Sequence, residues 1–406
     1  MKIALISAFP PGTRSLGEYG YHLALALAAD PAVTEVVVLA DLLTEALAEL
    51  ELPPGVRVRR VWGFNDPRAL PAILSALRQE RVAGAIYNLQ VASFGDREVP
   101  AALGLLAPLA SRLMGIRSGI IAHNIIAGVD LEQTNLKGQP MRQMVVRAAG
   151  RVITRAMCGA TYMTVTLRSY AQVLQTHYPR ADVTLVPHGT FDVGADDWVP
   201  QADRPARIVT MGKFGTYKRL ETLLAAFDVL RADPRHHAAQ LVIGGTDHPV
   251  TPGYMAGVAA TRRDDPGVTF AGYIPEDGVG AFFRQGRVCA FDYESTTGSS
   301  GVLHQAASHG AVPVFPHIGD FIDVTRDEGL SGVNYAPGDV AGLAAALDAV
   351  LSDPAGAETV ARANHASAMD MPLSRVAAFH VARLKQGAGP ATLSGRIVPP
   401  TLQHRP

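Results

Sequence analysis

The sequence lacks several features that would assign it to a specialised class of protein. Only two cysteines, Cys158 and Cys289, occur in 406 residues, which excludes a disulfide scaffold and a four-thiolate zinc site. Both stand in apolar surroundings and are expected to be buried in a core. No run reaches the roughly 18 apolar residues that a membrane helix needs. The apolar run Ile3–Phe9 follows one lysine and precedes two prolines, which favours a buried strand over an export signal, so we expect a cytoplasmic protein.

An excess of charge of one sign is also missing. The chain has 36 Lys and Arg against 37 Asp and Glu, a net charge of -1. This balance argues against binding to nucleic acid or to an acidic membrane through bulk charge. Hydrophobic residues make up 48% and charged residues 18%, so the chain can bury large cores, and its length predicts two or three domains.

Short apolar runs alternate with longer helical stretches. Because the runs are apolar throughout, they predict strands covered on both faces, as in a parallel α/β sheet. The expected strands of the first half are Ile3–Ala8, Glu35–Leu39, Val56–Val61, Gly84–Tyr87, Gly119–Ala122, Tyr162–Val165 and Thr184–Pro187, with helices at Tyr21–Ala29 and Leu70–Arg78.

The alternation restarts after a polar stretch. We predict a domain over residues 1–191, a linker over 192–205 and a second domain over 206–371, which begins with the strand Ala206–Met211. A helix over 372–386 and a disordered tail over 387–406 follow. The expected architecture is two doubly wound, Rossmann-like α/β domains that face each other across a ligand cleft.

Three strand–loop–helix junctions carry candidate chemistry. In the first, a strand ends at Phe9, glycines stand at positions 12, 17 and 20, and a helix is expected near Tyr21. Glycines in such a loop let backbone amides approach an anion, although an ordinary turn between strand and helix explains them as well.

The second junction is basic. A strand is expected to run into Gly212, a loop presents Lys213, Lys218 and Arg219, and a helix follows. Such cations would neutralise a diphosphate at the end of the sheet. The alternative is a solvated cationic loop.

The third junction is rich in Ser, Thr and Gly. A strand is expected to end near Tyr293 and a helix to begin near Ser300. The amides of Ser300, Gly301 and Val302 would form an anion site at the helix N-terminus. Ser299 or Ser300 could also simply cap the helix, and both can hold together.

With these junctions the sequence resembles the GT-B glycosyltransferases, and among them glycosyltransferase family 4, over about residues 1–386. The family's first loop often reads G-I-G-E-Y, and Leu16-Gly17-Glu18-Tyr19 fits it. Its Arg-x4-Lys pair corresponds to Lys213 and Lys218, and its P-N-G turn corresponds to Pro187-His188-Gly189. Its E-G-F-G-x4-E-A-x3-G-x-P-V motif aligns with residues 297–314, and Leu373–Lys385 resembles the family's terminal helix, which crosses back to the first domain.

The resemblance implies an acceptor-binding first domain and a nucleotide-sugar-binding second domain. It implies catalytic roles for His123, Lys213 and Lys218, where His123 follows a predicted strand and could otherwise cap a loop. The donor-binding positions that it implies are Gly17, Gly212, Lys213, Lys218, Thr297, Gly298, Ser300, Gly301, Val302 and Gln305.

The chain departs from the family at two acidic positions. The family's paired glutamates, eight positions apart, are replaced by Thr297 and Gln305, so that Glu294 or Asp292 would have to supply a carboxylate near the donor sugar. Gln305 can still accept a hydrogen bond from one ribose hydroxyl. Lys213 in place of arginine keeps the charge but loses the bidentate fork.

The resemblance predicts transfer of a sugar from a nucleoside diphosphate, UDP or GDP, with retention at the anomeric carbon. The acceptor would be a glycan, a lipid-linked sugar or a small molecule. No cofactor, metal or nucleic acid is expected, since the sequence has no metal-ligand motif, and a peripheral membrane contact is left open. Two alternatives remain: a GT-B-like binding protein without transferase activity, and a nucleotide-sugar epimerase.

Overall fold

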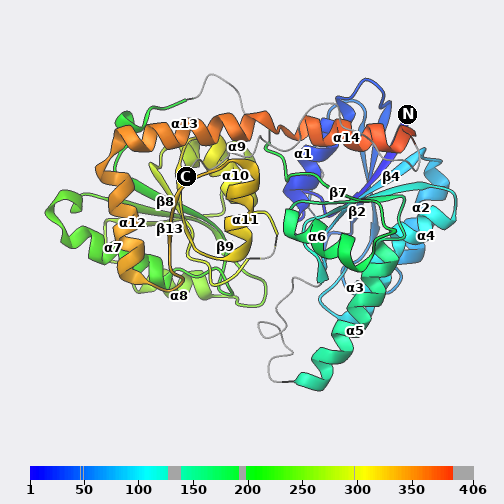
Figure 1. Ribbon diagram of the computed structural model, residues 1–406, viewed down its shortest axis with the longest axis horizontal. Helices are drawn as coiled ribbons and strands as arrows, with labels where there is room; N and C mark the ends of the chain where they lie inside the picture. Colours follow the sequence, from blue (N-terminus) through cyan, green and yellow to red (C-terminus); the bar gives the residue numbers. More distant parts are fainter. Residues whose placement is uncertain (46, 49, 127–138, 192–197, 297, 387–406) are drawn as a thin grey trace. The chain divides into compact units, whose positions relative to one another are not determined.

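The computed structural model describes residues 1–386 except positions 46, 49, 127–138, 192–197 and 297, and except the side chains of Arg142 and Val145. The predictions for Thr297, for the tail over 387–406 and for most of the linker's first half fall outside the described residues. The rest of the chain forms two compact units, which divide after His188 (Figure 1).

Unit 1 contains residues 1–188 and the helix α14 (Leu373–Gln386). Its seven-stranded sheet has the order β3-β2-β1-β4-β5-β6-β7, and each pair of neighbouring strands is parallel, as the apolar runs predict. The strands are β1 (Lys2–Ser7), β2 (Glu35–Asp41), β3 (Val56–Trp62), β4 (Gly84–Leu89), β5 (Arg117–Ala122), β6 (Tyr162–Val165) and β7 (Val183–Leu185). The other helices are α1 (Gly17–Ala28), α2 (Ala69–Glu80), α3 (Glu98–Leu105), α4 (Ala107–Leu113), α5 (Pro140–Met157) and α6 (Arg168–His177).

Unit 2 covers residues 189–372 and has a six-stranded parallel sheet in the order β10-β9-β8-β11-β12-β13. The strands are β8 (Arg207–Phe214), β9 (Gln240–Asp247), β10 (Val268–Gly272), β11 (Val288–Ala290), β12 (Val312–Pro316) and β13 (Val333–Tyr335). The helices are η3 (Gln201–Asp203), α7 (Glu221–Ala232), η4 (Pro234–His236), α8 (Tyr254–Ala260), α9 (Glu276–Arg284), α10 (Gly301–Ser308), α11 (Gly319–Glu328), α12 (Val340–Ser352) and α13 (Pro354–Asp370).

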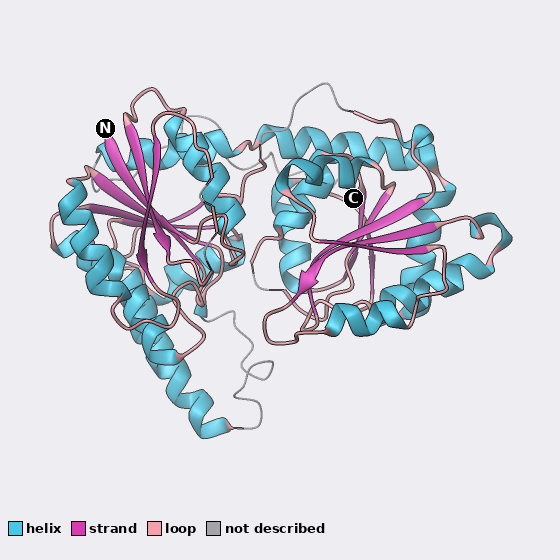
Figure 2. Ribbon diagram, turned by 180° about the vertical axis from the view of Figure 1, so that it is seen from behind, coloured by secondary structure: helices cyan, strands magenta, loops and turns pink. Residues whose placement is uncertain are grey.

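Helices cover both faces of each sheet (Figure 2), which explains why the strands are apolar on both sides. In unit 2 the central strands and helices α7 and α12 share one core, in which Phe227, Leu241 and Leu347 are fully buried. In described parts of the chain no single helix is long and apolar enough to span a membrane; α12 and α13 reach that length and hydropathy only as a pair bent by 95°.

Three predicted boundaries are wrong: at α1 and β8, residues of a helix and a strand were assigned to a loop, and at β11, loop residues were assigned to a strand. The helix α1 begins at Gly17 instead of near Tyr21, after Leu16 in a left-handed conformation with φ of 67°. The strand β8 continues to Phe214, so Lys213 lies in the sheet and only Lys218 and Arg219 lie in the loop. The strand β11 ends at Ala290 instead of near Tyr293, so that Asp292 and Tyr293 belong to the following loop.

The helix α14 is anchored in unit 1 by polar groups that are buried with it. Arg383 pairs with Asp182, and its guanidinium lies 4.9 Å from the centre of the Tyr162 ring. The Tyr162 hydroxyl bonds to His380 Nδ1 at 2.9 Å. Arg117 donates to the carbonyl oxygen of Leu384 at 2.6 Å, which satisfies the end of the helix. The terminal helix is thus part of the core of unit 1.

Replacing Arg383 by methionine should destabilise unit 1 by about 3 kcal/mol, near the low end for breaking a buried ion pair, because Asp182 stays partly in water. The same substitution at Lys385, which is exposed on the same helix, is the matched control and should cost less than about 0.5 kcal/mol. Hydrogen exchange of α14 and β6 measures the difference. Equal protection in the two variants would show that the buried pair does not hold the helix.

Candidate functional site

The sheet order places a switch point in unit 2 between β8 and β11. After β8 the chain forms β9 and β10 on one side of β8, and then crosses to the other side of β8 to form β11. Loops that follow such strands diverge and leave room for a ligand at the carboxyl end of the sheet. The loops in question are residues 215–220, called the β8 loop, and residues 291–300, called the β11 loop.

Backbone hydrogen bonds fasten the two loops to each other. Lys218 and Tyr293 form an isolated antiparallel bridge. The Arg219 amide donates to Asp292 O at 2.9 Å, and the Glu294 amide donates to Tyr217 O at 2.8 Å. The basic junction and the Ser/Thr junction of the sequence therefore form one structural site.

Gly212 and Gly245 allow the strands to approach closely beside this site. They are register partners in β8 and β9, and Gly245 has a φ of +132°. A Cβ atom on Gly245 would lie 1.9 Å from the carbonyl oxygen of Gly212, so no side chain fits there. A Cβ atom on Gly212 would lie 3.5 Å from Lys218 Cδ. The predicted donor-binding glycine thus lies against the predicted catalytic lysine.

Lys218 is a desolvated cation. Its Nζ lies 4.6 Å from the centre of the Tyr293 ring and 5.9 Å from that of Tyr217. Among the described residues no carboxylate pairs with it. Burial, together with the nearby charge of Lys213, lowers the pKa of Lys218 to about 8. An anion at this position would restore the charged form.

His248 is a third basic group here and was not among the predicted site residues. It follows β9, and its amide donates to Phe214 O at 2.7 Å. Burial and the charges of Lys213 and Lys218 lower the pKa of His248. A histidine directly after a strand next to the switch point was the only available signal.

Buried hydroxyl groups without partners gather on the same two loops. They belong to Thr216 in the β8 loop and to Tyr293, Thr296 and Ser299 in the β11 loop, and none has a hydrogen-bond partner among the described residues. Leaving a buried hydroxyl unpaired costs roughly 1–3 kcal/mol. Such a concentration is typical of a surface that a polar ligand completes.

The helix α10 begins where the β11 loop ends. Ser300 caps it by accepting from the Leu303 amide, and Gly301 and Val302 are its first residues, whose amides have no intrahelical partner. Asp320 accepts from the Gly298 amide at 2.7 Å and fixes the loop before the helix. Gln305 is buried one turn further on. Capping by Ser300 and an anion site at the next amides are compatible.

The buried side chain of His304 connects α10 to Glu328 at the end of α11. Although burial opposes the charged form of His304, the carboxylate of Glu328, 2.7 Å from Nε2, and the carbonyl of Ser300, 2.8 Å from Nδ1, raise the pKa of His304.

The two acidic residues expected to replace the family glutamate have other partners. Asp292 is buried and accepts from the Leu223 amide at 3.0 Å, which caps α7. Burial raises the pKa of Asp292, and the hydrogen bond opposes the shift. Glu294 is exposed and pairs with Arg219 at 3.0 Å. Within the described residues no group of three or more His, Cys, Asp or Glu side chains could hold a metal ion.

The remaining predicted site residues, His123 and Gly17, lie in unit 1, after the strands β5 and β1 respectively. His123 is buried, and its Nε2 lies 2.7 Å from Asn88 Oδ1. Burial lowers the pKa of His123 to about 3, so the ring is neutral at ordinary pH. Tyr19 packs edge-on against His123 at 4.6 Å and donates to His188 O at 2.8 Å. Gly17, the predicted donor-binding glycine of this unit, begins the helix that carries Tyr19.

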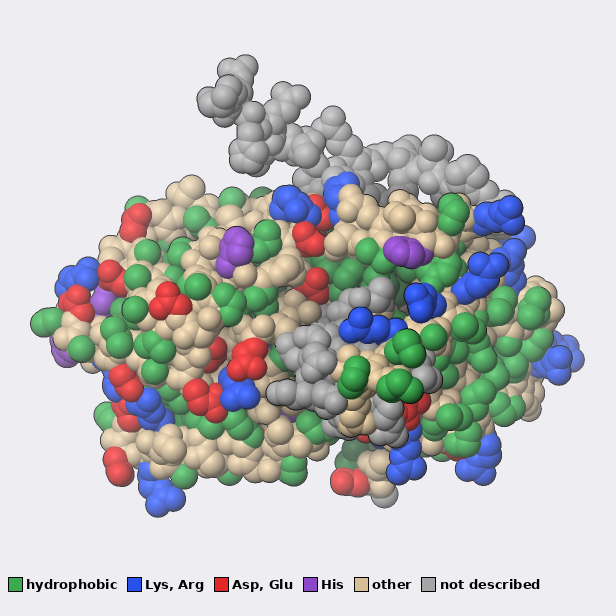
Figure 3. All heavy atoms as spheres, turned by 60° about the horizontal axis from the view of Figure 1, so that its bottom comes forward, with side chains coloured by type: hydrophobic (Ala, Val, Ile, Leu, Met, Phe, Trp, Pro, Cys, Tyr) green, Lys and Arg blue, Asp and Glu red, His purple; other side chains and the backbone are tan. Residues whose placement is uncertain are grey.

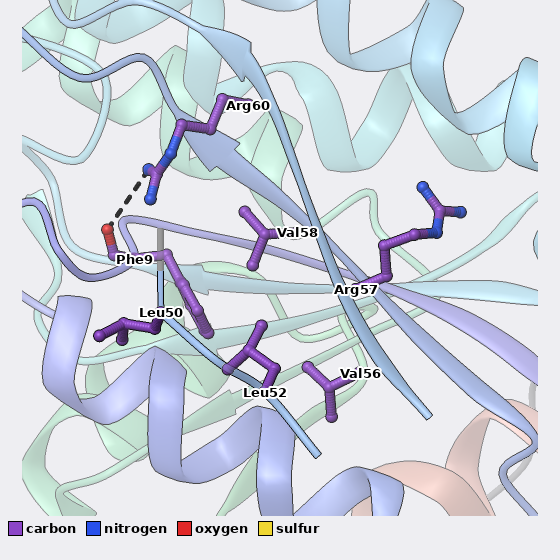
Figure 4. A pocket seen from close by; sticks show the side chains of 7 residues that line it. All are labelled: Phe9, Leu50, Leu52, Val56, Arg57, Val58 and Arg60. Atoms are coloured by element: carbon purple, nitrogen blue, oxygen red, sulfur yellow. Dashed lines mark hydrogen bonds between the residues drawn. The ribbon is translucent and has the colours of Figure 1, made fainter. Parts of the chain in front are cut away.

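A pocket of about 490 Å³ lies elsewhere in unit 1, at the edge strand β3 (Figure 4). Arg60 donates to the Asp41 and Pro10 carbonyl oxygens beside it, at 2.9 and 2.7 Å. Its lining contains none of the predicted site residues and consists of Phe9, Leu50, Leu52, Val56, Arg57, Val58 and Arg60.

Part of the chain matches a known family. Residues 205–353 match the family described as "Glycosyl transferases group 1". The glycogen synthase of Mycobacterium tuberculosis is 30% identical over 189 residues, which make up 45% of this chain and 43% of that protein. The chain thus spans less than half the length of this curated relative.

Solved structures share the fold over nearly the whole chain. Sucrose-phosphate synthase from Thermosynechococcus elongatus has a TM-score of 0.70 at 19% identity, covering 95% of this chain and 98% of that one. Anabaena Alr3699/HepE in complex with UDP-glucose has a TM-score of 0.63 at 13% identity, covering 94% and 99%. The predicted pair of Rossmann-like domains is confirmed: the chain has the GT-B fold, and its residues 205–353 match the group 1 glycosyl transferases.

Proposed function

We propose that this protein is a retaining, metal-independent glycosyltransferase of family 4 that takes its sugar from a nucleoside diphosphate. One observation carries the proposal: the β8 and β11 loops hold a desolvated lysine beside four buried hydroxyls, and within the described residues the lysine has no carboxylate partner and the hydroxyls have no hydrogen-bond partner. A nucleotide-sugar supplies the negative charge and the acceptor oxygens that these groups lack.

The chemical task is to stabilise the diphosphate as it leaves. Lys218 and Lys213 place positive charge at the end of β8, and the first amides of α10 add the positive end of a helix. Charge of this kind, fixed before the reaction, lowers the barrier where negative charge develops. In this proposal the leaving phosphate takes the acceptor proton, so no protein nucleophile is required.

The nucleotide is proposed to be UDP or GDP. The Anabaena structure is described as a complex with UDP-glucose, and this supports a UDP-sugar for the shared fold. Gln305, buried on α10, is the proposed ribose contact and offers one acceptor oxygen.

Unit 1 is proposed to bind the acceptor. His123 is neutral, and its Nε2 is engaged by Asn88, so it would act as a hydrogen-bonding group and not as a base that titrates near neutrality.

A second candidate function is nucleotide binding without transfer. Gln305 in place of a glutamate favours it, because a neutral amide holds the ribose less firmly than a carboxylate does. Turnover of a sugar nucleotide separates the two functions.

A panel of UDP-, GDP-, ADP- and TDP-sugars tests the proposal by thermal shift in EDTA. One nucleotide at 100 times its dissociation constant should stabilise the protein by about 2.7 kcal/mol without any metal. Release of free nucleoside diphosphate on adding an acceptor shows transfer. Stabilisation that requires magnesium or manganese would contradict the metal-independent mechanism.

Lys218→Met should weaken binding of the preferred nucleoside diphosphate by about 1.5–3 kcal/mol, the range for a charge-assisted hydrogen bond. Because the free lysine has a pKa of about 8 and only its protonated form attracts the anion, wild-type affinity should be full below pH 7 and fall above pH 8. The variant should lose this alkaline decline. Calorimetric titration between pH 6.5 and 9.5 measures both effects.

Arg263→Gln, an exposed charge loss in the same unit, is the control for the lysine variant and should leave both affinity and pH profile unchanged. An alkaline decline that survives in Lys218→Met would assign the titration to another group and return the β8 loop to a structural role.

Thr216→Val should separate binding from folding. Because the hydroxyl has no partner among the residues that the structure describes, removing it should leave stability unchanged or raise it slightly. Nucleotide affinity should fall by about 1 kcal/mol if the ligand supplies the missing partner. Urea unfolding and calorimetry on the same samples measure the two quantities. A loss of stability with unchanged affinity would mean that the hydroxyl serves the fold.

A further inference from the structure

The helix α5 has the composition of a helix that meets an anionic surface. Its 18 residues, PMRQMVVRAAGRVITRAM, include four arginines and no aspartate or glutamate. The whole chain has a net charge of -1, so this concentration of positive charge is local. The near-zero net charge of the whole chain therefore does not exclude that α5 attracts anions.

One face of α5 packs on unit 1 and the other is exposed. Gln143, Gly150 and Thr154 are buried. A Cβ atom on Gly150 would lie 2.5 Å from Ile126 Cγ2, so the helix lies close to the body of the unit at this point. In Figure 1 the N-terminal end of α5 projects away from the sheet of unit 1. The packed face fixes which side chains the helix offers to its surroundings.

The exposed face is apolar as well as basic. Met141, Met144 and Val152 are 73%, 60% and 66% exposed, an unfavourable place for large apolar side chains in water. Arg147 and Arg155 are exposed along the same helix. Figure 3, in which the lower side of Figure 1 comes forward, shows hydrophobic and basic side chains over this part of unit 1.

In the part of the chain that the structure describes, the arginines of this face have no acidic partners. Among the described residues no carboxylate pairs with Arg147, Arg151 or Arg155, whereas Arg57, Arg231, Arg262 and Arg326 elsewhere in the chain each form ion pairs. The backbone carbonyl oxygen of Arg151 accepts from the Tyr178 hydroxyl at 3.1 Å. Their charge is therefore available to an external anion.

We propose that α5 docks this protein on an anionic lipid bilayer. Arginines at the level of the headgroups attract the phosphates, while the methionines and the valine enter the boundary with the acyl chains. A nucleic acid would use the arginines but offers nothing to the exposed Met141, Met144 and Val152. This inference does not depend on the proposed transferase activity.

Co-sedimentation of the full chain with vesicles tests the proposal. Vesicles of phosphatidylcholine with 30% phosphatidylglycerol should bind the protein at 50 mM salt, and pure phosphatidylcholine vesicles should bind it more than ~10-fold more weakly. Binding should decrease as salt is raised, because the Debye length shortens.

Two variants separate the charge from the apolar contact. The triple substitution Arg147→Gln, Arg151→Gln, Arg155→Gln should lower the partition coefficient on anionic vesicles about 100-fold, at roughly fivefold for each arginine. The triple substitution Met141→Gln, Met144→Gln, Val152→Gln should lower it about 10-fold or more. The matched control is Arg78→Gln, Arg81→Gln, Arg263→Gln, which removes three exposed arginines away from α5 and should keep the binding. Circular dichroism checks that all variants are folded.

A single tryptophan substitution reports insertion directly. In Met144→Trp the emission should shift to the blue on anionic vesicles and should be quenched by brominated acyl chains. Of the two native tryptophans, Trp62 is buried and Trp198 is half-buried against the core of unit 2, so the wild-type emission on the same vesicles is subtracted as the reference. Wild-type binding to neutral and anionic vesicles alike, or equal loss in the control triple, would overturn the proposal. Loss in the arginine triple with full binding in the apolar triple and no quenching would also overturn it, in favour of a polyanion such as nucleic acid.

Discussion

Both units obey one constraint: a parallel sheet needs a crossover after every strand, so all strands end at the same edge. Helices therefore cover both faces, and the loops that leave the carboxyl ends collect side chains from segments far apart in the sequence. Lys218 and Tyr293 form a bridge although 75 positions separate them. The chemistry of unit 2 depends on this arrangement, since neither loop by itself contains both the cation and the group of hydroxyls.

The site in unit 2 is held in a state that is costly without a ligand. Lys218 is desolvated, and the hydroxyls of Thr216, Thr296 and Ser299 are buried with no partner in the described part of the chain. Three contacts hold the surrounding backbone in place: Asp292 caps α7, Asp320 bonds to the Gly298 amide, and β8 and β9 approach each other closely at Gly245. Unpaired polar groups in a well-braced frame are what a preorganised anion site requires. The same groups in a flexible loop would turn toward water.

In unit 1, in contrast to the site of unit 2, the buried histidines have hydrogen-bond partners. His123 and His380 are buried as neutral rings, since burial lowers the pKa of each to about 3, and each has a hydrogen-bond partner in Asn88 and Tyr162. The helix α14, distant in sequence, completes the core of this unit. The exposed face of α5 is the exception, where apolar and basic groups remain without partners in the described chain.

The sequence determined most of the strands and the parallel sheets, because runs that are apolar on both faces fit few other arrangements, and Tyr162–Val165 has the predicted bounds. The short strand β13 was not predicted. The sequence also determined that Lys213, Lys218 and the residues near Ser300 lie at sheet ends. It could not place Lys213 within β8 or join Asp292 to the cap of α7, because strand length and capping depend on neighbours distant in the chain. Nor could it select His248 or the unpaired hydroxyl of Thr216. Desolvation and missing partners are properties of packing, and only the tertiary structure decides which polar groups lose water.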